Sequence, residues 1–147
     1  MERNLLISIT SIQWQGNEKS ESELLTKARC RLINGHSVIS YEDTSATGFE
    51  GSVTTITIDG KTASIVRRGS ANSALNLEMG KKHFCQYGTP YGNMHIGVFT
   101  HAIDDDLKND GRLYLKYTLD LNSSYLSDNE IILKIKNVDK NIDRKEL

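Results

Sequence analysis

The chain has 147 residues, a formal charge of −1 and a mean hydropathy of −0.44. This length suits one domain with a buried core, so we expect a single domain over residues 1–137 and a charged tail over residues 138–147. A nearly neutral chain offers no field for recruiting nucleic acid or an anionic membrane surface. No apolar run approaches the ~20 residues of a membrane-spanning helix.

The N-terminus and the cysteines indicate the compartment. Residues 1–16 lack a basic segment followed by an apolar block and a cleavage site, so we expect no secretory signal and a cytoplasmic location. Cys30 and Cys85 are far apart in the sequence and lack C-x-x-C spacing. A disulfide between them remains an alternative, but two reduced thiols with a structural role fit the cytoplasm better.

Apolar residues near the N-terminus occur at alternate positions. This period of two predicts a strand over residues 4–14. Residues 16–22 form a polar break, and the residues from Glu18 onward suit a helical turn. We predict that the next apolar stretch, residues 24–33, is extended, although its spacing also suits a helix.

Two dipeptides mark tight hairpins in the next part of the chain. Asn34-Gly35 and Asp59-Gly60 are typical of two-residue hairpin turns. Residues 44–51 are rich in Ser, Thr and Gly and predict a loop between the two hairpins. The strands beside these turns are predicted over residues 36–43, 53–58 and 62–68.

A central segment over residues 83–103 contains the only proline of the chain, Pro90. Pro90 favours extended geometry at the residue before it, and Gly88 and Gly92 permit the φ values that a turn needs. The predicted order is therefore strand, reversal and strand, over residues 83–88, 88–92 and 93–103, after a short strand at 75–77.

A charged turn over residues 104–111 precedes the clearest half-buried strand, residues 113–121, in which leucines alternate mainly with polar residues. Asp128-Asn129 then predicts a turn before a last strand over residues 131–136. The total is nine or ten short strands, joined mostly by hairpins, with no long amphipathic helix.

This pattern predicts an all-β fold. An open sheet of so many antiparallel strands would expose unpaired edges, and closure into a barrel removes them. Because strands that are adjacent in sequence are linked by hairpins, we favour an antiparallel up-and-down barrel of about 8–10 strands over a β-sandwich.

Several short motifs occur in a defined order along the chain. They are Ser40-Tyr41-Glu42 after the first hairpin, Arg67-x-Gly69 at the end of the fifth strand, Tyr87 before the Gly92 turn, Thr100, and Tyr117 after Gly111. In their order and spacing the chain resembles the YwiB-like family of bacterial domains of unknown function, from the first strand to about residue 136. The resemblance implies a calycin-like, or lipocalin-like, β-barrel. The family carries no established activity, and the Gly-x-Trp pattern of lipocalins is absent.

Four residues place polar groups on the predicted strand faces: Arg67, Tyr87, Thr100 and Tyr117. An eight-stranded barrel is either filled by side chains or holds one small ligand, so we predict that these four bind a ligand at one mouth or inside. A buried guanidinium must face a protein carboxylate or an anionic ligand. The other interpretation is a structural network, with Arg67 extending to solvent.

The candidate metal ligands are His83, Cys85, His95 and His101. His95 and His101 lie close to 20 Å apart along a strand at ~3.3 Å per residue, and structural zinc sites use tighter spacing, so we expect no metal and no cofactor. The chain has no G-x-S-x-G, no H-E-x-x-H and no phosphate-binding glycine loop. We therefore assign no catalytic residues and do not expect an enzyme.

These observations favour a cytoplasmic barrel that binds a small molecule. The alternative is a non-catalytic protein-interaction module with a filled barrel. A lined void with convergent polar groups would favour the first function, and an interior packed with Leu and Ile would favour the second. We expect no nucleic-acid or membrane partner, and exposed edge strands would favour a homodimer.

Overall fold

The computed structural model describes residues 2–89 and 92–137, except for the side chains of residues 2, 87–89, 93 and 137. Within that range the protein is all-β, apart from the four-residue helix α1 (Leu107–Asp110), and no helix there is long and apolar enough to cross a membrane. The strands are, in chain order, β1 (Glu2–Gln15), β2 (Glu18–Ile33), β3 (His36–Glu42), β4 (Ser52–Asp59), β5 (Thr62–Gly69), β6 (Ser73–Glu78), β7 (Lys82–Thr89), β8 (Gly92–Asp106), β9 (Arg112–Leu121) and β10 (Ser124–Asn137).

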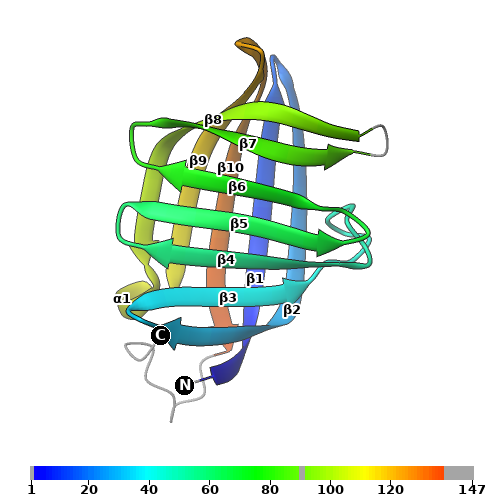
Figure 1. Ribbon diagram of the computed structural model, residues 1–147. Helices are drawn as coiled ribbons and strands as arrows, with labels where there is room; N and C mark the ends of the chain where they lie inside the picture. The colour runs from blue at the N-terminus through cyan, green and yellow to red at the C-terminus, as the bar shows by residue number, and fades with distance from the viewer. Residues whose placement is uncertain (1, 90–91, 138–147) are drawn as a thin grey trace.

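The strands close into a barrel in the order β1-β10-β9-β8-β7-β6-β5-β4-β3-β2, and neighbouring strands are antiparallel. In Figure 1, β3 to β7 cross the front of the barrel, and β1, β9 and β10 run crosswise behind them. β2 starts in the back wall and ends at the front, below β3. β8 belongs to both walls, and a register shift between Thr100 and Ala102 accompanies its bend. The predicted antiparallel up-and-down barrel of about 8–10 strands is confirmed, in place of the sandwich alternative.

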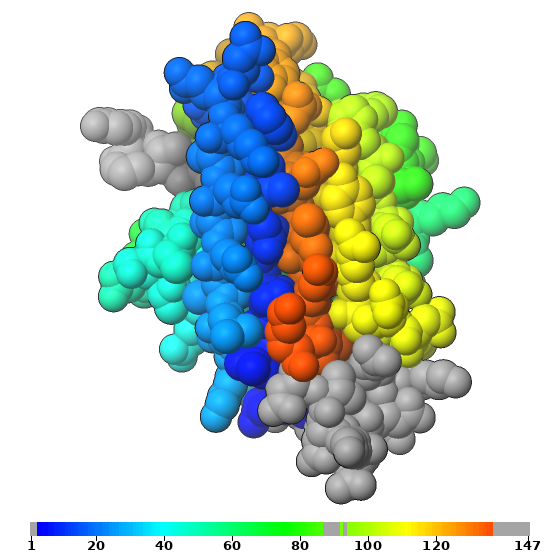
Figure 2. All heavy atoms as spheres, turned by 180° about the vertical axis from the view of Figure 1, so that it is seen from behind, coloured from blue at the N-terminus to red at the C-terminus, as the bar shows by residue number. Residues whose placement is uncertain are grey.

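Closure of the barrel depends on β1, which pairs with β2 on one side and with β10 on the other. From behind, β2, β1, β10 and β9 lie side by side (Figure 2). Each strand of the described range therefore has a neighbour on both sides. The homodimer prediction depended on exposed edge strands, so the closed order removes its premise, and the dimer stays a prediction.

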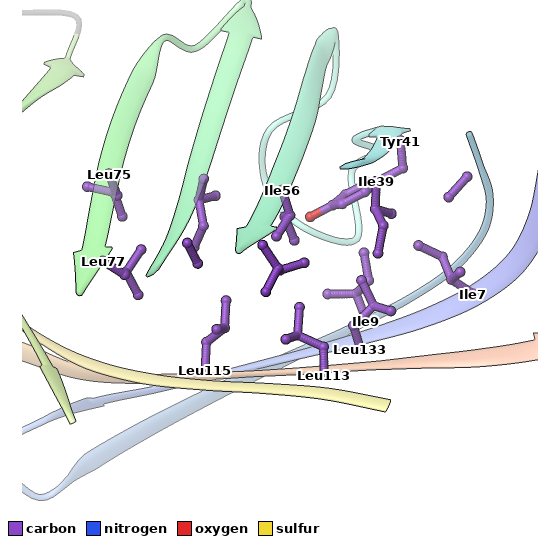
Figure 3. Packing of buried hydrophobic residues seen from close by; sticks show 14 of the residues in the cluster. Ile7, Ile9, Ile39, Tyr41, Ile56, Leu75, Leu77, Leu113, Leu115 and Leu133 are labelled. Carbon is purple, nitrogen blue, oxygen red and sulfur yellow. The ribbon is translucent and has the colours of Figure 1, made fainter. Parts of the chain in front are cut away.

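Alternate side chains of the strands fill the interior. On β9, Leu113 and Leu115 are fully buried and Tyr117 is nearly so, as the alternation predicts. Figure 3 shows that Ile56 and Leu77 on the front strands point toward Leu113 and Leu115 on the back wall. Burial of such aliphatic side chains, at about 25 cal/mol per Å² of apolar surface, is the main favourable contribution to folding.

The polar break with a helical turn, predicted over residues 16–22, is wrong. β2 begins at Glu18, whose partner is Gln15 across a two-residue turn, and residues 24–33 are extended as predicted. The polar residues continue the strand because their inward positions, Ser20 and Ser22, line a cavity instead of the apolar core. The start of β2 was therefore not predicted as a strand, because its inward residues are polar.

The turn predicted at Asp128-Asn129 is also wrong. The chain reverses at Asn122 and Ser123, whose φ angles are 51° and 67°, as a two-residue hairpin of the primed type requires. Asn129 lies within β10 and is buried. A polar residue at an inward position was again the cause of the error.

The two predicted Gly-containing hairpins have different outcomes. Asn34 and Gly35 have positive φ angles of 50° and 80°, and the hairpin that they predict is confirmed. The second hairpin turns one residue later than predicted, because Asp59 is still in β4 and pairs with Thr62.

The region after the central strand is more ordered than the predicted charged turn over residues 104–111. β8 continues to Asp106, and α1 follows with Leu107 fully buried. This single apolar residue anchors the connection to the core. Pro90 in the predicted reversal and the predicted tail over residues 138–147 lie outside the described residues.

Cys30 and Cys85 are buried and are not joined by a disulfide. Burial raises the pKa of the Cys30 thiol to about 11, so this thiol stays protonated near neutral pH and is a poor nucleophile. The sulfur of Cys85 accepts a hydrogen bond from the backbone N–H of Asn76 at 3.3 Å. Both thiols lie in surroundings that are typical of buried structural cysteines.

Candidate functional site

The inward-facing side chains change from aliphatic to polar toward one end of the barrel. On β1, Ile9 is followed at the inward positions by Ser11 and Gln13, and on β10 Ile131 gives way to Asn129. β2 follows the same pattern, with serines in the place of leucine. Since alternate residues of a strand share one face, this end of the barrel has a polar interior.

A cavity of about 340 Å³ lies at this polar end. Its volume is at the lower end of the range for small-molecule sites, roughly 300–1,000 Å³. Its apolar surface comes from Ile65, Leu75, Leu119 and Ile131. Its neutral and basic hydrogen-bonding groups come from Ser11, Gln13, Ser20, Ser22, Tyr41, Thr47, Arg67, Ser73, Tyr117 and Asn129. Glu21 and Glu130 also line it, and their carboxylates lie 3.7 Å from Nζ of Lys19 and 2.7 Å from the Tyr114 hydroxyl, respectively.

The front wall of the cavity is organised by strand register. Tyr41, Thr54 and Arg67 lie directly opposite one another on β3, β4 and β5. Ser73 on β6 continues the row. Directly opposite residues on antiparallel strands have Cβ atoms about 4.5–5.5 Å apart, so the register gathers these polar side chains on one face.

Asp43 is the anion of this wall, and its side chain is 0% exposed. Its Oδ2 accepts a hydrogen bond from the Thr54 hydroxyl at 2.6 Å and another from Nε of Arg67 at 3.4 Å. Its Oδ1 accepts from the Thr47 hydroxyl at 3.0 Å. Burial of a charge is tolerated when the charge is paired and hydrogen-bonded, and these contacts meet both conditions.

The loop between β3 and β4 places an aromatic ring on Arg67. The central carbon of the guanidinium lies 3.7 Å from the centroid of the Phe49 ring, a cation–π contact. Ser70 anchors this loop, because its hydroxyl donates to the carbonyl of Glu50 at 2.6 Å and its N–H donates to that of Gly51 at 3.3 Å. Phe49 is thereby held at the edge of the cavity.

Tyr41 contributes a neutral hydroxyl to the site. Burial, and to a smaller extent the negative charge of Asp43, raise the pKa of Tyr41 to about 12. The charge of Arg67 and hydrogen bonds with Thr54 and Arg67 act in the opposite direction and are weaker. The hydroxyl therefore stays protonated at neutral pH and remains a hydrogen-bond donor.

The four predicted site residues have separate positions. Arg67 and Tyr117 line the same cavity, from β5 and β9. Thr100 is fully buried and its hydroxyl accepts the backbone N–H of Glu78 at 3.2 Å, away from the cavity. The side chain of Tyr87 lies outside the described residues. Of the two partners expected for a buried guanidinium, Arg67 has the protein carboxylate.

The sequence prediction missed Tyr41, Asp43, Thr54, Phe49 and Asn129. Only strand register reveals that the first three converge on Arg67. Asp43 follows the last residue of β3, a position that resembles any solvated carboxylate beside a loop. A signal was present in Asn129 and in the serines of β1 and β2, because polar residues at inward positions of neighbouring strands indicate a wet interior.

A second hollow, also of about 340 Å³, extends over β3 to β7 and includes two of the histidines. Nε2 of His83 lies 2.9 Å from Oε1 of Glu78, and Nε2 of His36 lies 3.6 Å from Oδ2 of Asp59. Across the part of the chain that the structure describes, no group of three or more His, Cys, Asp or Glu side chains is placed to hold a metal ion. The cavity at the polar end of the barrel, called the mouth cavity from here on, is therefore the better candidate site.

A family model for a domain of unknown function, DUF1934, matches residues 7–133. The chain belongs to this family. The matched segment of the DUF1934 domain includes part or all of every strand, together with the complete candidate site.

The crystal structure of the ywiB protein from Bacillus subtilis is similar to this DUF1934 domain. The two share 14% sequence identity with a TM-score of 0.73, over 92% of this chain and 94% of that one. At this identity the likeness concerns the fold, and the YwiB-like resemblance found in the sequence is confirmed. None of the curated proteins matches the chain, so the function of the DUF1934 domain has to be argued from the site.

Proposed function

We propose that this DUF1934 domain is a cytoplasmic barrel that binds a small molecule in the polar mouth cavity. The observation that supports the proposal most is the contrast between the two parts of the interior. Most of the barrel is filled by aliphatic side chains, whereas the mouth retains a cavity of about 340 Å³ with hydrogen-bonding groups around it. Cavities with an apolar surface and a few convergent polar groups are typical of ligand sites.

The two walls of the cavity offer different contacts. The front wall supplies the Tyr41 hydroxyl and the guanidinium of Arg67, and the back wall supplies neutral side chains such as Gln13 and Asn129. Ile65 and Leu75 provide apolar surface between them. A ligand that fills this space would bury apolar area and form several hydrogen bonds at the same time.

The alternative from the sequence, an interaction module with a filled barrel, lacks a comparable observation. Its premise was an interior packed throughout with Leu and Ile, and the mouth cavity departs from that premise. The interaction module stays a prediction, as does the absence of enzymatic activity.

Native mass spectrometry of untagged protein, purified quickly from its host, tests the proposal. We expect a reproducible mass excess over the bare chain that disappears on denaturation, because a molecule bound in the cavity is held by noncovalent contacts alone. Its accurate mass would identify the molecule.

A matched pair of variants locates the bound molecule. Ser22 lines the cavity, whereas Glu23 is the next residue of β2 and is exposed. Ser22→Trp should fill the mouth and abolish the mass excess, and Glu23→Trp should retain it; circular dichroism checks that both fold. A bare mass for the wild-type protein, or an excess that Ser22→Trp leaves unchanged, would contradict the proposal.

A further inference from the structure

The charge balance of the mouth cavity specifies the kind of molecule that it takes. Resting on the proposed function, we infer that the ligand is an uncharged ring compound with several hydroxyl or amide groups, as in a nucleoside or a sugar, and that its phosphorylated form is rejected. Three features carry the inference: an internally neutralised arginine, a row of neutral polar side chains at the inward positions of β1, β2 and β10, and aromatic and aliphatic surface beside that row.

The positive charge of Arg67 is balanced within the protein. Nε of Arg67 lies 3.4 Å from the carboxylate of Asp43, whose side chain is 0% exposed, and that of Arg67 is only 15% exposed. Phe49 covers one face of the guanidinium at 3.7 Å. An anionic ligand would have to lose its hydration beside a buried carboxylate, so its charge would find no uncompensated partner here.

The guanidinium is nevertheless able to contact a neutral ligand. The hydrogen bonds of Arg67 to Asp43 and Thr54 use Nε, and Tyr41 also hydrogen-bonds to Arg67. A guanidinium carries four further N–H donors on its terminal nitrogens. Arg67 lines the cavity. These donors suit the oxygen of a hydroxyl or carbonyl group, which requires no countercharge.

At the inward positions of β1, β2 and β10, the back wall consists of neutral donors and acceptors in direct register. The two carboxylates that also line the cavity, those of Glu21 and Glu130, pair with Lys19 and with the Tyr114 hydroxyl. Ser11 pairs with Ser22, and Gln13 pairs with both Ser20 and Asn129. Since cross-strand partners have Cβ atoms about 4.5–5.5 Å apart, one ligand can contact several of these groups at once. Among the described residues that line the cavity, Arg67 is the one basic side chain, so the wall offers no second cation to a phosphate.

Flat and apolar surface lies beside this polar wall. Tyr117 is 7% exposed and lies directly opposite Asn129 on the neighbouring strand. Leu119 and Ile131 also line the cavity. Aromatic side chains provide stacking surface for the rings of small molecules, so the site combines a face for a ring with groups for its polar edge.

Isothermal titration calorimetry with matched pairs tests the inference. The probes are adenosine and uridine against their 5′-monophosphates, and glucose against glucose 6-phosphate. We expect at least one neutral member to bind about 10- to 100-fold more tightly than its phosphorylated partner, since the phosphate has no unpaired cation to meet. Equal or tighter binding of the phosphorylated members would overturn the inference.

The outcome separates this inference from the proposed function. If none of the six probes binds while native mass spectrometry still finds a bound molecule, the ligand class is wrong and the small-molecule function stands. A bound molecule whose mass shows a phosphate or carboxylate group would overturn the class in the same way. A bare protein mass would remove both.

One variant should weaken the preference for the neutral member. Asp43→Asn leaves the charge of Arg67 without its partner, so the ratio of affinities should shift toward the phosphorylated member by about tenfold or more. Asp59→Asn, which removes an exposed carboxylate outside the cavity, should leave the ratio unchanged. An Asp43→Asn protein that folds and keeps the wild-type ratio would contradict the inference; if it does not fold, the wild-type ratio decides.

Discussion

Single side chains at the mouth have both a structural and a binding role. Asp43 and Arg67 hold each other in the interior, and removal of one partner would leave a buried charge, which typically costs about 3–5 kcal/mol. Tyr41 differs because it is buried as a neutral group. Replacing Tyr41 by Phe therefore leaves no unpaired charge at neutral pH. The contribution of the Tyr41 proton to the free energy of unfolding can then be measured from the pH dependence of stability.

Tyr41 should make the fold sensitive to alkaline pH. The pKa of an unfolded tyrosine is about 10, and that of Tyr41 is raised to about 12. The folded state holds the proton more tightly, so this stabilisation is complete below about pH 10 and is lost as the pH rises toward 12. Between about pH 9 and pH 11.5, the free energy of unfolding of the wild type should fall by about 2 kcal/mol more than that of Tyr41→Phe.

Urea denaturation at a series of pH values measures this difference. Tyr114, with a pKa also raised to about 12, and Cys30, with a pKa raised to about 11, remain in both proteins, so their contributions cancel. Parallel stability curves for the wild type and Tyr41→Phe would show that the proton on Tyr41 is not linked to folding.

At the scale of elements, the hairpin of β4 and β5 supports the loop between β3 and β4, which holds Phe49 at the edge of the cavity. Gly69, at the end of β5, pairs with Ser52 and has a φ angle of 131°. A Cβ atom there would collide with the carbonyl oxygen of Gly51 and lie 2.9 Å from the Cα of Ser52. The end of the hairpin and the loop that carries Phe49 therefore require glycine at this position.

Gly69→Ala should destabilise the fold more than Gly60→Ala. Both glycines have positive φ angles, 131° and 60°, but an added Cβ at Gly60 meets open space. We expect a loss of about 1–2 kcal/mol for Gly60→Ala from backbone strain alone, and about 2–5 kcal/mol for Gly69→Ala because a backbone collision is added. Urea denaturation measures both, and equal losses would contradict the role of the close contact.

At the scale of the whole molecule, the barrel has one weak seam. In the described range, β6 and β7 are in register at the single pair Ser73 and Tyr87. Farther along, the N–H of Asn76 donates to the sulfur of Cys85, and an isolated bridge joins Met79 to β8. Full ladders connect the other neighbours, so local opening should begin between β6 and β7.

Hydrogen–deuterium exchange should show faster exchange in β6 than in β1 or β9. Cys85→Ala removes the acceptor of the Asn76 N–H and should increase exchange in β6 further, because that amide loses its partner. Cys30→Ala, a matched buried cysteine on β2, should leave β6 unchanged. Equal protection of the backbone amides of β6 and β1 against exchange in the wild type would contradict a weak seam between β6 and β7.

The sequence by itself determined most of the strands and the closed meander. Alternation at Leu113, Leu115 and Tyr117 and the Asn34-Gly35 turn are local signals, since each depends on backbone geometry within a few residues. The prediction failed over residues 16–22 and at Asn129, where the strand period was intact but the inward residues were polar.

Only the tertiary structure decided which polar groups form a site. Asp43 and Arg67 are 24 residues apart, and their contact depends on the register of β3, β4 and β5. Thr100 resembles the other predicted site residues in sequence, yet the bend of β8 directs its hydroxyl to the backbone of Glu78. Register and bending arise from packing around the whole barrel, and a local pattern of residues does not contain them.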